Sequence, residues 1–279
     1  QKACINILTT NKNLTSSTKN INKFYWNPEL NKIDSNCIDG VKVIINLAGS
    51  PIAQLWTKSS KKSILLSRIN SVKLLNQIIL EKNSKIDHFV CASAIGIYKS
   101  DNSYIHRESS QNYSNSFLGN TVSKWETSCE KLKEQKINVT FLRIGLVLSL
   151  NGGLLKPIAL SVKYFLGTWF GNGGNIYSWI HIDDLVDSIL FLLNNNKTGI
   201  YNLVAPNPIS SKLFTLEISK VLNKKILIPP IPLFLIKLIT GSMSELFLFS
   251  QNVSSKKIIE EGFNFQYKSI SSALINLLK

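Results

Sequence analysis

Two apolar runs that end in small residues constrain the fold of this chain most strongly. Residues 41–46 lead into Leu47, Ala48 and Gly49, and residues 89–91 lead into Ala92, Ser93 and Ala94. Both runs are rich in apolar residues without polar alternation, as strands of a buried parallel sheet are. Ligands of open α/β sheets bind beyond the carboxyl ends of the strands. The small residues at these two ends would let a flat ligand lie against the main chain, so they predict where the site lies.

The rest of the chain alternates strands with helices, which predicts a doubly wound parallel α/β sheet. We expect strands at residues 4–8, 41–46, 89–93 and 139–148, and helices at residues 59–81, 122–132 and 184–193. Beyond residue 150, clustered glycines and proline turns replace this rhythm. We therefore predict a sheet domain over residues 1–150 with a returning segment near 176–205, and a smaller substrate lobe with a C-terminal domain over residues 151–279.

Composition excludes several classes of protein. With 44% hydrophobic and 18% charged residues, the chain is globular and not disordered. Its four cysteines are far apart and show no CxxC spacing, which predicts buried free thiols and no metal site. The most hydrophobic stretch, residues 226–239, is too short and too interrupted by prolines and Lys237 to span a bilayer. No signal-peptide pattern opens the chain, so we expect a cytoplasmic protein without a membrane partner.

The net charge of +15 raises the question of a nucleic-acid partner. The lysines are scattered, however, and form only short pairs such as Lys61-Lys62 and Lys224-Lys225. No basic stripe interleaves with aromatic residues. We therefore expect no specific nucleic-acid binding, while weak attraction to polyanions or to a phosphate-bearing ligand needs no dedicated site.

A glycine-rich phosphate-binding turn is missing from the 14 glycines, none of which forms a GxGxxG or GxxGxxG pattern. A dinucleotide-binding sheet normally begins with a strand, such a turn and a helix that receives the pyrophosphate. The chain also starts with Gln1 and not with Met. We therefore expect that a first strand-turn-helix unit of about 25 to 30 residues precedes this chain, which would make residues 4–8 the second strand.

A series of ordered motifs resembles a known family. The motifs are Ile45-Asn46-Leu47-Ala48-Gly49, Ser67-Arg68-Ile69, Ser93-Ala94-Ile95-Gly96-Ile97-Tyr98, Lys124-Trp125-Glu126, residues 143–148 (RIGLVL), Gly152-Gly153, residues 179–185 (WIHIDDL), residues 201–206 (YNLVAP), and Gly262-Phe263 with Phe265. Together they resemble the epimerase-like branch of the extended short-chain dehydrogenase/reductases, described as nucleoside-diphosphate-sugar epimerases with a small C-terminal domain. The resemblance implies a Rossmann-type fold whose domain over residues 1–150 binds a nicotinamide dinucleotide, NADP(H) with NAD as the alternative.

The resemblance also implies which residues contact the cofactor. Leu47, Ala48 and Gly49 would present bare main chain to the adenosine-ribose side, and Arg68 matches a position that reaches the cofactor. Val147 would pass beneath the nicotinamide, and Ser93 would lie at the end of its strand. Thr9 and Thr10 stand where the family often places an Arg near the ribose, a residue that would suit a 2′-phosphate. Lys12 is close enough in sequence to take that role.

The catalytic pair of most short-chain dehydrogenases is absent. None of the eight tyrosines has Lys four residues on, so the Tyr-x-x-x-Lys arrangement that lowers a phenol pKa does not occur. We expect Ser93, Tyr98 and Lys124 as catalytic candidates. His181 and Asn202 are candidates for substrate contact, although His181 could equally be a packed, hydrogen-bonded side chain. Asp183 is expected to cap the following helix, and the segment from Gly167 to Gly174 is either a mobile flap or a turn-rich connection.

Two functions follow as alternatives. The first is an NAD(P)-binding epimerase or oxidoreductase that acts on a sugar nucleotide or another small carbonyl or alcohol without the Tyr-x-x-x-Lys pair. The second is a non-catalytic dinucleotide-binding sensor or scaffold.

Overall fold

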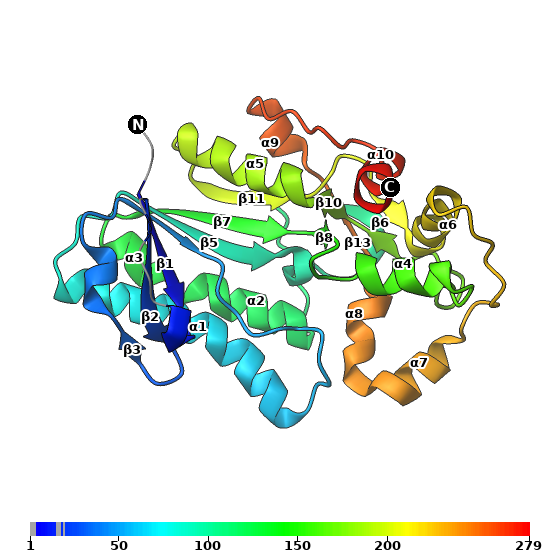
Figure 1. Ribbon diagram of the computed structural model, residues 1–279, viewed down its shortest axis with the longest axis horizontal. Helices are drawn as coiled ribbons and strands as arrows, with labels where there is room; N and C mark the ends of the chain where they lie inside the picture. Colours follow the sequence, from blue (N-terminus) through cyan, green and yellow to red (C-terminus); the bar gives the residue numbers. More distant parts are fainter. Residues whose placement is uncertain (1–3, 15–17, 19) are drawn as a thin grey trace. The chain divides into compact units, whose positions relative to one another are not determined.

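The computed structural model describes residues 4–14, 18 and 20–279 of the chain (Figure 1). It has the alternating α/β organisation that the sequence predicts. The strands are β1 (Ile5–Thr9), β2 (Ile21–Asn27), β3 (Lys32–Ile33), β4 (Val43–Asn46), β5 (His88–Ala94), β6 (Asp101–His106), β7 (Asn138–Ile144), β8 (Leu146–Leu148), β9 (Ile176–Tyr177), β10 (Trp179–His181), β11 (Gly199–Leu203), β12 (Ile209–Ser210) and β13 (Gln251–Val253). The α-helices are α1 (Lys58–Glu81), α2 (Phe117–Thr127), α3 (Glu130–Glu134), α4 (Leu155–Lys163), α5 (Ile182–Asn194), α6 (Ser211–Val221), α7 (Leu233–Thr240), α8 (Glu245–Leu248), α9 (Lys256–Glu260) and α10 (Ile270–Leu278). Short 3-10 helices are η1 (Lys12–Leu14), η2 (Ser35–Ile38), η3 (Ile95–Ile97) and η4 (Gly241–Ser244).

A four-stranded sheet with the order β11-β7-β5-β4 carries the two strands that the apolar runs predict. β4 and β5 are parallel, with Val43 opposite His88 and Asn46 opposite Cys91. β5 is buried from His88 to Ser93, which explains why its sequence is nearly continuous in apolar residues. β4 exposes Val43 and Ile45, which corrects the expectation that both strands are buried. Because the two strands are parallel, their carboxyl ends lie at the same edge of the sheet.

A second, three-stranded sheet has the order β1-β2-β3. β1 confirms the strand predicted at residues 4–8, shifted by one residue. β2 was not predicted, because its Asn and Lys residues resemble the polar segment that precedes it. It nevertheless pairs in parallel with β1 along its length, from Ile21 opposite Ile5 to Tyr25 opposite Thr9.

The chain divides into two compact units. The first comprises Gln1–Ile52, Thr57–Ala92 and Ser123–Phe141, and the second comprises Ala53–Trp56, Ser93–Val122 and Leu142–Lys279. In the first unit, Thr57 caps α1, since its Oγ1 accepts a hydrogen bond of 3.1 Å from the Ser60 N–H. Of the periodic apolar residues that predict α1, Ile64, Val72, Leu75 and Ile79 are buried, and Leu65 and Ile69 are half-buried.

The second unit has its own apolar core. Leu148, Trp179 and Phe214 are fully buried there, beside side chains of α4 and α10. The helices α4, α6 and α10 therefore lie side by side (Figure 1). α7 lies at the periphery of this unit, at the end of the long segment that follows α6 (Figure 1).

Two predicted elements are each divided in the structure. The helix expected at residues 122–132 is α2 followed by α3, with a break at Ser128, whose hydroxyl donates to the Trp125 carbonyl at 2.6 Å and competes with the helical pattern. The strand expected at residues 139–148 is β7 and β8, which are separated by Gly145. A Cβ at Gly145 would lie 2.3 Å from the Ser178 carbonyl oxygen, so the close approach of these chains requires glycine there.

The four cysteines are free, and Cys37, Cys91 and Cys129 are buried. Cys4 is exposed, which corrects the expectation that all four thiols are buried. Within the described ranges, no helix has both the length and the apolar character needed to cross a membrane.

Candidate functional site

The carboxyl end of β4 is open, as the small residues there predict. The buried Asn46 turns the chain at this point: its Oδ1 accepts from the Ala48 N–H at 3.2 Å and its Nδ2 donates to Ser71 Oγ at 3.1 Å. Leu47 is 60% exposed, Gly49 is also exposed and Ala48 is half-buried, so this end of the strand is accessible to solvent. Ser50 continues the turn and is held by Ser67 of α1, whose Oγ accepts from the Ser50 N–H at 2.9 Å.

Arg68 of α1 lies directly against Gly49. A Cβ added at Gly49 would be 2.9 Å from Arg68 Cζ and 3.1 Å from each terminal guanidinium nitrogen. The guanidinium can therefore occupy this position because residue 49 has no side chain. This contact brings together two of the residues that the sequence analysis assigns to the cofactor.

The Arg68 guanidinium is buried in neutral surroundings. The side chain is only 8% exposed, and burial lowers the pKa of Arg68 to about 10. Its Nη1 donates to the Ile64 carbonyl at 2.8 Å and to the Ser50 carbonyl at 3.3 Å, while Cζ lies 5.2 Å from the centre of the Trp125 ring. Both recorded acceptors are uncharged. A buried cation that is bound by neutral carbonyls favours an anionic ligand beside it.

The end of β5 leads into a buried tyrosine in the second unit. Ser93 is buried near the end of the strand, and η3 then carries the chain to Tyr98, which is fully buried. The Tyr98 hydroxyl accepts from Arg143 Nη1 at 2.9 Å and donates to Asn202 Oδ1 at 2.8 Å. Burial raises the pKa of Tyr98 to about 12, although the Arg143 charge and hydrogen bonds oppose this rise.

Asn202 belongs to the same network and is also fully buried. Its main-chain N–H donates to Glu108 Oε1 at 2.9 Å and its Nδ2 donates to the Ser254 carbonyl at 3.2 Å. The structure thus brings together Tyr98 and Asn202, two of the predicted site residues. Arg143 is a member of this network that was not predicted, although a single Arg between Leu142 and Ile144 in an apolar strand is a signal that indicates a buried polar role.

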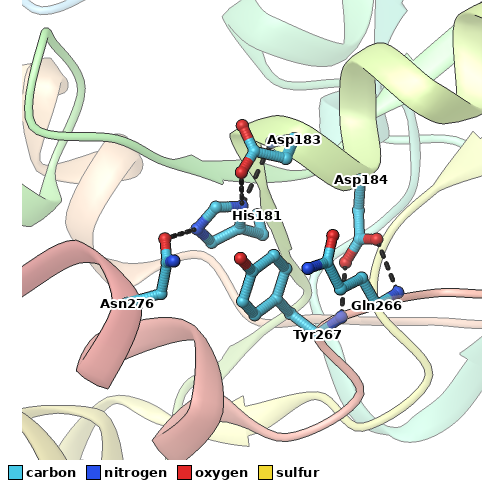
Figure 2. A network of polar contacts seen from close by, with 6 residues as sticks. All are labelled: His181, Asp183, Asp184, Gln266, Tyr267 and Asn276. Atoms are coloured by element: carbon cyan, nitrogen blue, oxygen red, sulfur yellow. Dashed lines mark hydrogen bonds and ion pairs between the residues drawn. The ribbon is translucent and has the colours of Figure 1, made fainter.

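His181 belongs to a second network of the same unit, shown in Figure 2. Its Nδ1 accepts from the Asp183 N–H at 3.1 Å, and its Nε2 lies 3.1 Å from Asn276 Oδ1. The Asp183 carboxylate oxygen Oδ2 also lies 3.6 Å from Nδ1. The ring stacks on Tyr267 with a centroid separation of 3.8 Å. Both nitrogens and one face of this ring are therefore occupied by the chain itself.

This network corrects the expected cap of α5. His181, and not Asp183, is the N-cap residue, because its ring nitrogen accepts the Asp183 N–H. Asp184 turns inward instead, and its carboxylate oxygens accept from the Gln266 N–H at 2.7 Å and the Tyr267 N–H at 2.9 Å (Figure 2). The start of α5 is thus bound to the segment that precedes α10.

Four further predicted site residues have no recorded hydrogen bond to these networks in the described part of the chain. Thr9 ends β1, where its Oγ1 accepts from the Asn11 N–H at 3.1 Å, and Thr10 follows it in an exposed position. Lys124 is exposed on α2 in the first unit. Val147 is half-buried in β8, where it pairs with Ile180 of β10.

A parallel sheet with an open strand end and a buried cation beside it defines a Rossmann-like α/β protein with a candidate nucleotide site. Residues 28–203 match the family model described as the NAD dependent epimerase/dehydratase family, and residues 231–277 match a domain of unknown function, DUF1731. The chain is 35% identical over 243 residues to the epimerase family protein SA0724 of Staphylococcus aureus strain N315, which covers 86% of this chain and 80% of that protein. The chain belongs to the NAD dependent epimerase/dehydratase family, and the resemblance to extended short-chain dehydrogenase/reductases is confirmed.

Solved structures agree on the fold. The crystal structure of human epimerase family protein SDR39U1 with NADPH matches with a TM-score of 0.84 at 23% identity, over 97% of this chain and 89% of that chain. A mutant of UDP-glucuronic acid 4-epimerase from Bacillus cereus, in complex with UDP-4-deoxy-4-fluoro-glucuronic acid and NAD, matches with a TM-score of 0.74 at 17% identity, over 93% of this chain and 81% of that chain. The predicted doubly wound, Rossmann-type architecture is therefore confirmed.

Proposed function

We propose that this chain binds NADP(H) at the end of β4 and acts as an epimerase or oxidoreductase on a sugar nucleotide or another small carbonyl or alcohol. The observation that carries the proposal is the contact between Gly49 and the buried Arg68 guanidinium. Bare main chain and a fixed cation suit a phosphate-bearing nucleotide, because charge-assisted hydrogen bonds are the strong ones in such a buried site. Leu47 and Ala48 extend the same open surface. The cytoplasmic location stays a prediction from the sequence.

The choice of NADP(H) over NAD(H) rests on charge. Thr9 and Thr10 supply no cation where a 2′-phosphate would lie, and we assign that role to the nearby Lys12. The Lys12 ammonium lies 5.1 Å from the centre of the Tyr25 ring, which holds the side chain near the end of β1. The structure of human SDR39U1 contains NADPH, which supports the same choice, whereas the Bacillus cereus epimerase structure contains NAD.

The proton step needs a group other than a Tyr-x-x-x-Lys tyrosine, since no such pair occurs in the sequence. A bound nicotinamide supplies hydride transfer, and a side chain of the protein must exchange the accompanying proton. Tyr98 fits poorly, because its hydroxyl is buried between Arg143 and Asn202 and its pKa is raised to about 12. Ser93 and Lys124 are our remaining candidates, with Val147 beneath the nicotinamide and His181 and Asn202 as candidates on the substrate side.

Titration of the full-length protein with NADPH and with NADH, followed by nicotinamide fluorescence and calorimetry, tests the proposal. We expect NADPH to bind more tightly than NADH. Arg68→Met should weaken NADPH binding by about tenfold or more, the worth of one charge-assisted hydrogen bond. The matched control is Arg107→Met, which removes the same charge from an exposed position and should leave the affinity within about twofold, as surface charges contribute little.

Stability measurements separate a binding role of Arg68 from a structural one. Because burial of the guanidinium without a counter-charge is costly, Arg68→Met should leave the free energy of unfolding of the ligand-free protein unchanged or raise it. Absence of NADPH binding in the parent protein, or equal NADPH affinity in Arg68→Met and the parent, would remove the proposal.

A non-catalytic dinucleotide sensor is the second candidate. The enclosed Tyr98 hydroxyl and the absent Tyr-x-x-x-Lys pair favour it. A panel of sugar nucleotides and small aldehydes, assayed for NADPH oxidation or for epimerised product, distinguishes the two candidates. Turnover with any member contradicts the sensor, and binding without turnover across the panel supports it.

A further inference from the structure

We propose that the second unit carries a surface that docks on an anionic lipid bilayer, and we call it the α7 face. Its members share exposure and apolar character: Phe165, Leu166, Leu227, Phe234, Leu238 and Ile239. The exposed fractions reach 67% for Phe234, 79% for Leu238 and 75% for Ile239. Adjacent large apolar side chains that are exposed to this degree mark interaction surfaces in folded proteins.

The α7 face is one surface, because its two segments are bonded to each other. The Ile231 N–H donates to the Trp169 carbonyl at 2.9 Å, and the Gly171 N–H donates to the Ile231 carbonyl at 2.9 Å. Thr168 Oγ1 donates to the Pro229 carbonyl at 2.8 Å. These contacts place residues 168–171 beside residues 229–231, directly before α7.

The charge of the α7 face identifies the partner's chemistry. Residues 156–178 and 218–244, which contribute the face, contain no Asp or Glu, and Glu217 and Glu245 flank the second segment. The two segments contain Lys156, Lys163, Lys224, Lys225 and Lys237, besides Lys220, which pairs with Glu217. Lys224 lies within the face, with its ammonium 5.0 Å from the centre of the Phe165 ring. Lysines around apolar side chains complement an anionic lipid surface, to which each lysine adds binding energy.

The geometry of α7 favours a bilayer over a peptide groove. Ile236 is its buried residue, while Leu233, Phe234, Leu238 and Ile239 are exposed. At about 100° per residue these four positions cover more than half of the helix circumference. A groove accepts one stripe of residues three and four apart, whereas the boundary between lipid headgroups and acyl chains accepts a broad apolar surface. A second copy is disfavoured, because a symmetric contact would bring the lysines of both copies together.

A contact of this kind is peripheral and agrees with the lack of a membrane-crossing helix among the described residues. The sequence predicts no membrane partner, and the proposal departs from that expectation. The reason is that residues 226–239 resemble an interrupted core segment in the sequence. Their exposure in the folded chain could not be predicted from hydropathy.

Flotation with lipid vesicles tests the proposal. We expect the protein to float with vesicles of phosphatidylcholine mixed with phosphatidylglycerol, to bind pure phosphatidylcholine weakly, and to dissociate as salt is raised. Leu238→Glu should lower the vesicle partition coefficient by about tenfold or more, because it replaces an inserting apolar side chain with a charge. The double change Lys224→Ser, Lys225→Ser should lower it by about fivefold per lysine.

The matched control is Leu80→Glu, which adds the same charge to an exposed helical leucine of the first unit that is 58% exposed. It should keep parental vesicle binding, apart from the small effect of one added charge. Both glutamate variants should keep the parental circular dichroism and unfolding curve, since both leucines are exposed. Failure of the parent protein to float with the anionic vesicles would overturn the proposal, and so would an equal loss in the two glutamate variants. A fall in molar mass by light scattering in Leu238→Glu, without lipid binding by the parent, would assign the α7 face to a second copy instead.

Discussion

Removing the hydroxyl of Tyr98 should destabilise the folded chain, because that hydroxyl links two buried partners. Tyr98→Phe keeps the ring, including its stacking below the Arg143 guanidinium at 5.1 Å from the ring centre. It removes the acceptor of Arg143 Nη1 at 2.9 Å and the donor to Asn202 Oδ1 at 2.8 Å. Since Tyr98, Arg143 and Asn202 are all buried, water cannot replace either bond without rearrangement.

The expected decrease in the free energy of unfolding follows from the two hydrogen bonds, one to a charged group and one to a neutral group. A hydrogen bond to a charged group contributes about 1.5 to 3 kcal/mol and a neutral one about 0.5 to 1.5 kcal/mol. Together they predict a decrease of roughly 2 to 4 kcal/mol in the free energy of unfolding. Urea unfolding followed by far-UV circular dichroism measures this decrease as a lower midpoint at an unchanged slope.

Tyr104→Phe is the matched control for this measurement. The Tyr104 hydroxyl makes a long contact of 3.4 Å with Ser110 Oγ, and the side chain is exposed. Its removal should change the free energy of unfolding by less than about 0.5 kcal/mol. If Tyr98→Phe proved as stable as Tyr104→Phe, the Tyr98 hydroxyl would not be part of a structural network, and its assignment as a proton donor would regain support.

Three other perturbations probe the same physical reasoning. Thr57→Ala should lower the free energy of unfolding by about 1 kcal/mol through loss of the α1 cap, while Thr57→Ser should restore it; equal stability of Thr57→Ala and the parent would contradict the cap. Asp184→Asn should cost about 2 to 4 kcal/mol, because an amide cannot accept both the Gln266 and Tyr267 N–H groups, whereas the exposed Asp183→Asn should cost less than about 1 kcal/mol in the same urea assay. Burial lowers the pKa of His88, so the unfolded chain binds a proton at higher pH than the folded chain does. Stability is therefore full above the unfolded pKa of about 6.5 and falls as the pH drops below it, by up to about 1.4 kcal/mol per pH unit for this group. Urea titrations between about pH 7.5 and 5.5 should show a shallower fall in His88→Gln, and an identical slope would refute the assignment.

The sequence predicted those strands and helices whose own residues carry an apolar run or a helical periodicity. The apolar runs locate β4 and β5 within two residues, and the helical periodicity locates α1 within one residue. β2 was missed because its Asn22 and Lys23 continue the polar segment that precedes it, although Phe24, Tyr25 and Trp26 follow. The break at Gly145 was missed because the requirement for glycine comes from Ser178, which is distant in sequence.

The candidate site also has features that the sequence could predict and features that it could not. The open end of β4 could be predicted, since Ala48 and Gly49 are small whatever surrounds them. The contact of Gly49 with Arg68 depends on the direction in which α1 returns across the sheet. No local sequence pattern predicts that direction. The cap of α5 was assigned to Asp183 because carboxylates are preferred caps. His181 takes that role with its ring held on the other side by Asn276, which lies 95 residues further along the chain and which no local pattern could indicate.

The buried polar groups of this chain differ in whether the protein itself supplies their hydrogen-bond partners and counter-charges. The Tyr98 hydroxyl, the His181 ring and the Asp184 carboxylate each find their partners within the second unit, so folding alone accounts for their positions. The Arg68 guanidinium is held by main-chain carbonyls, which supply no opposite charge. Burial of a cation costs several kcal/mol unless a counter-charge offsets it. The first group of residues therefore stabilises the fold, whereas Arg68 lacks a counter-charge from its recorded hydrogen-bond acceptors, and the cofactor phosphate that we propose at the end of β4 would supply one.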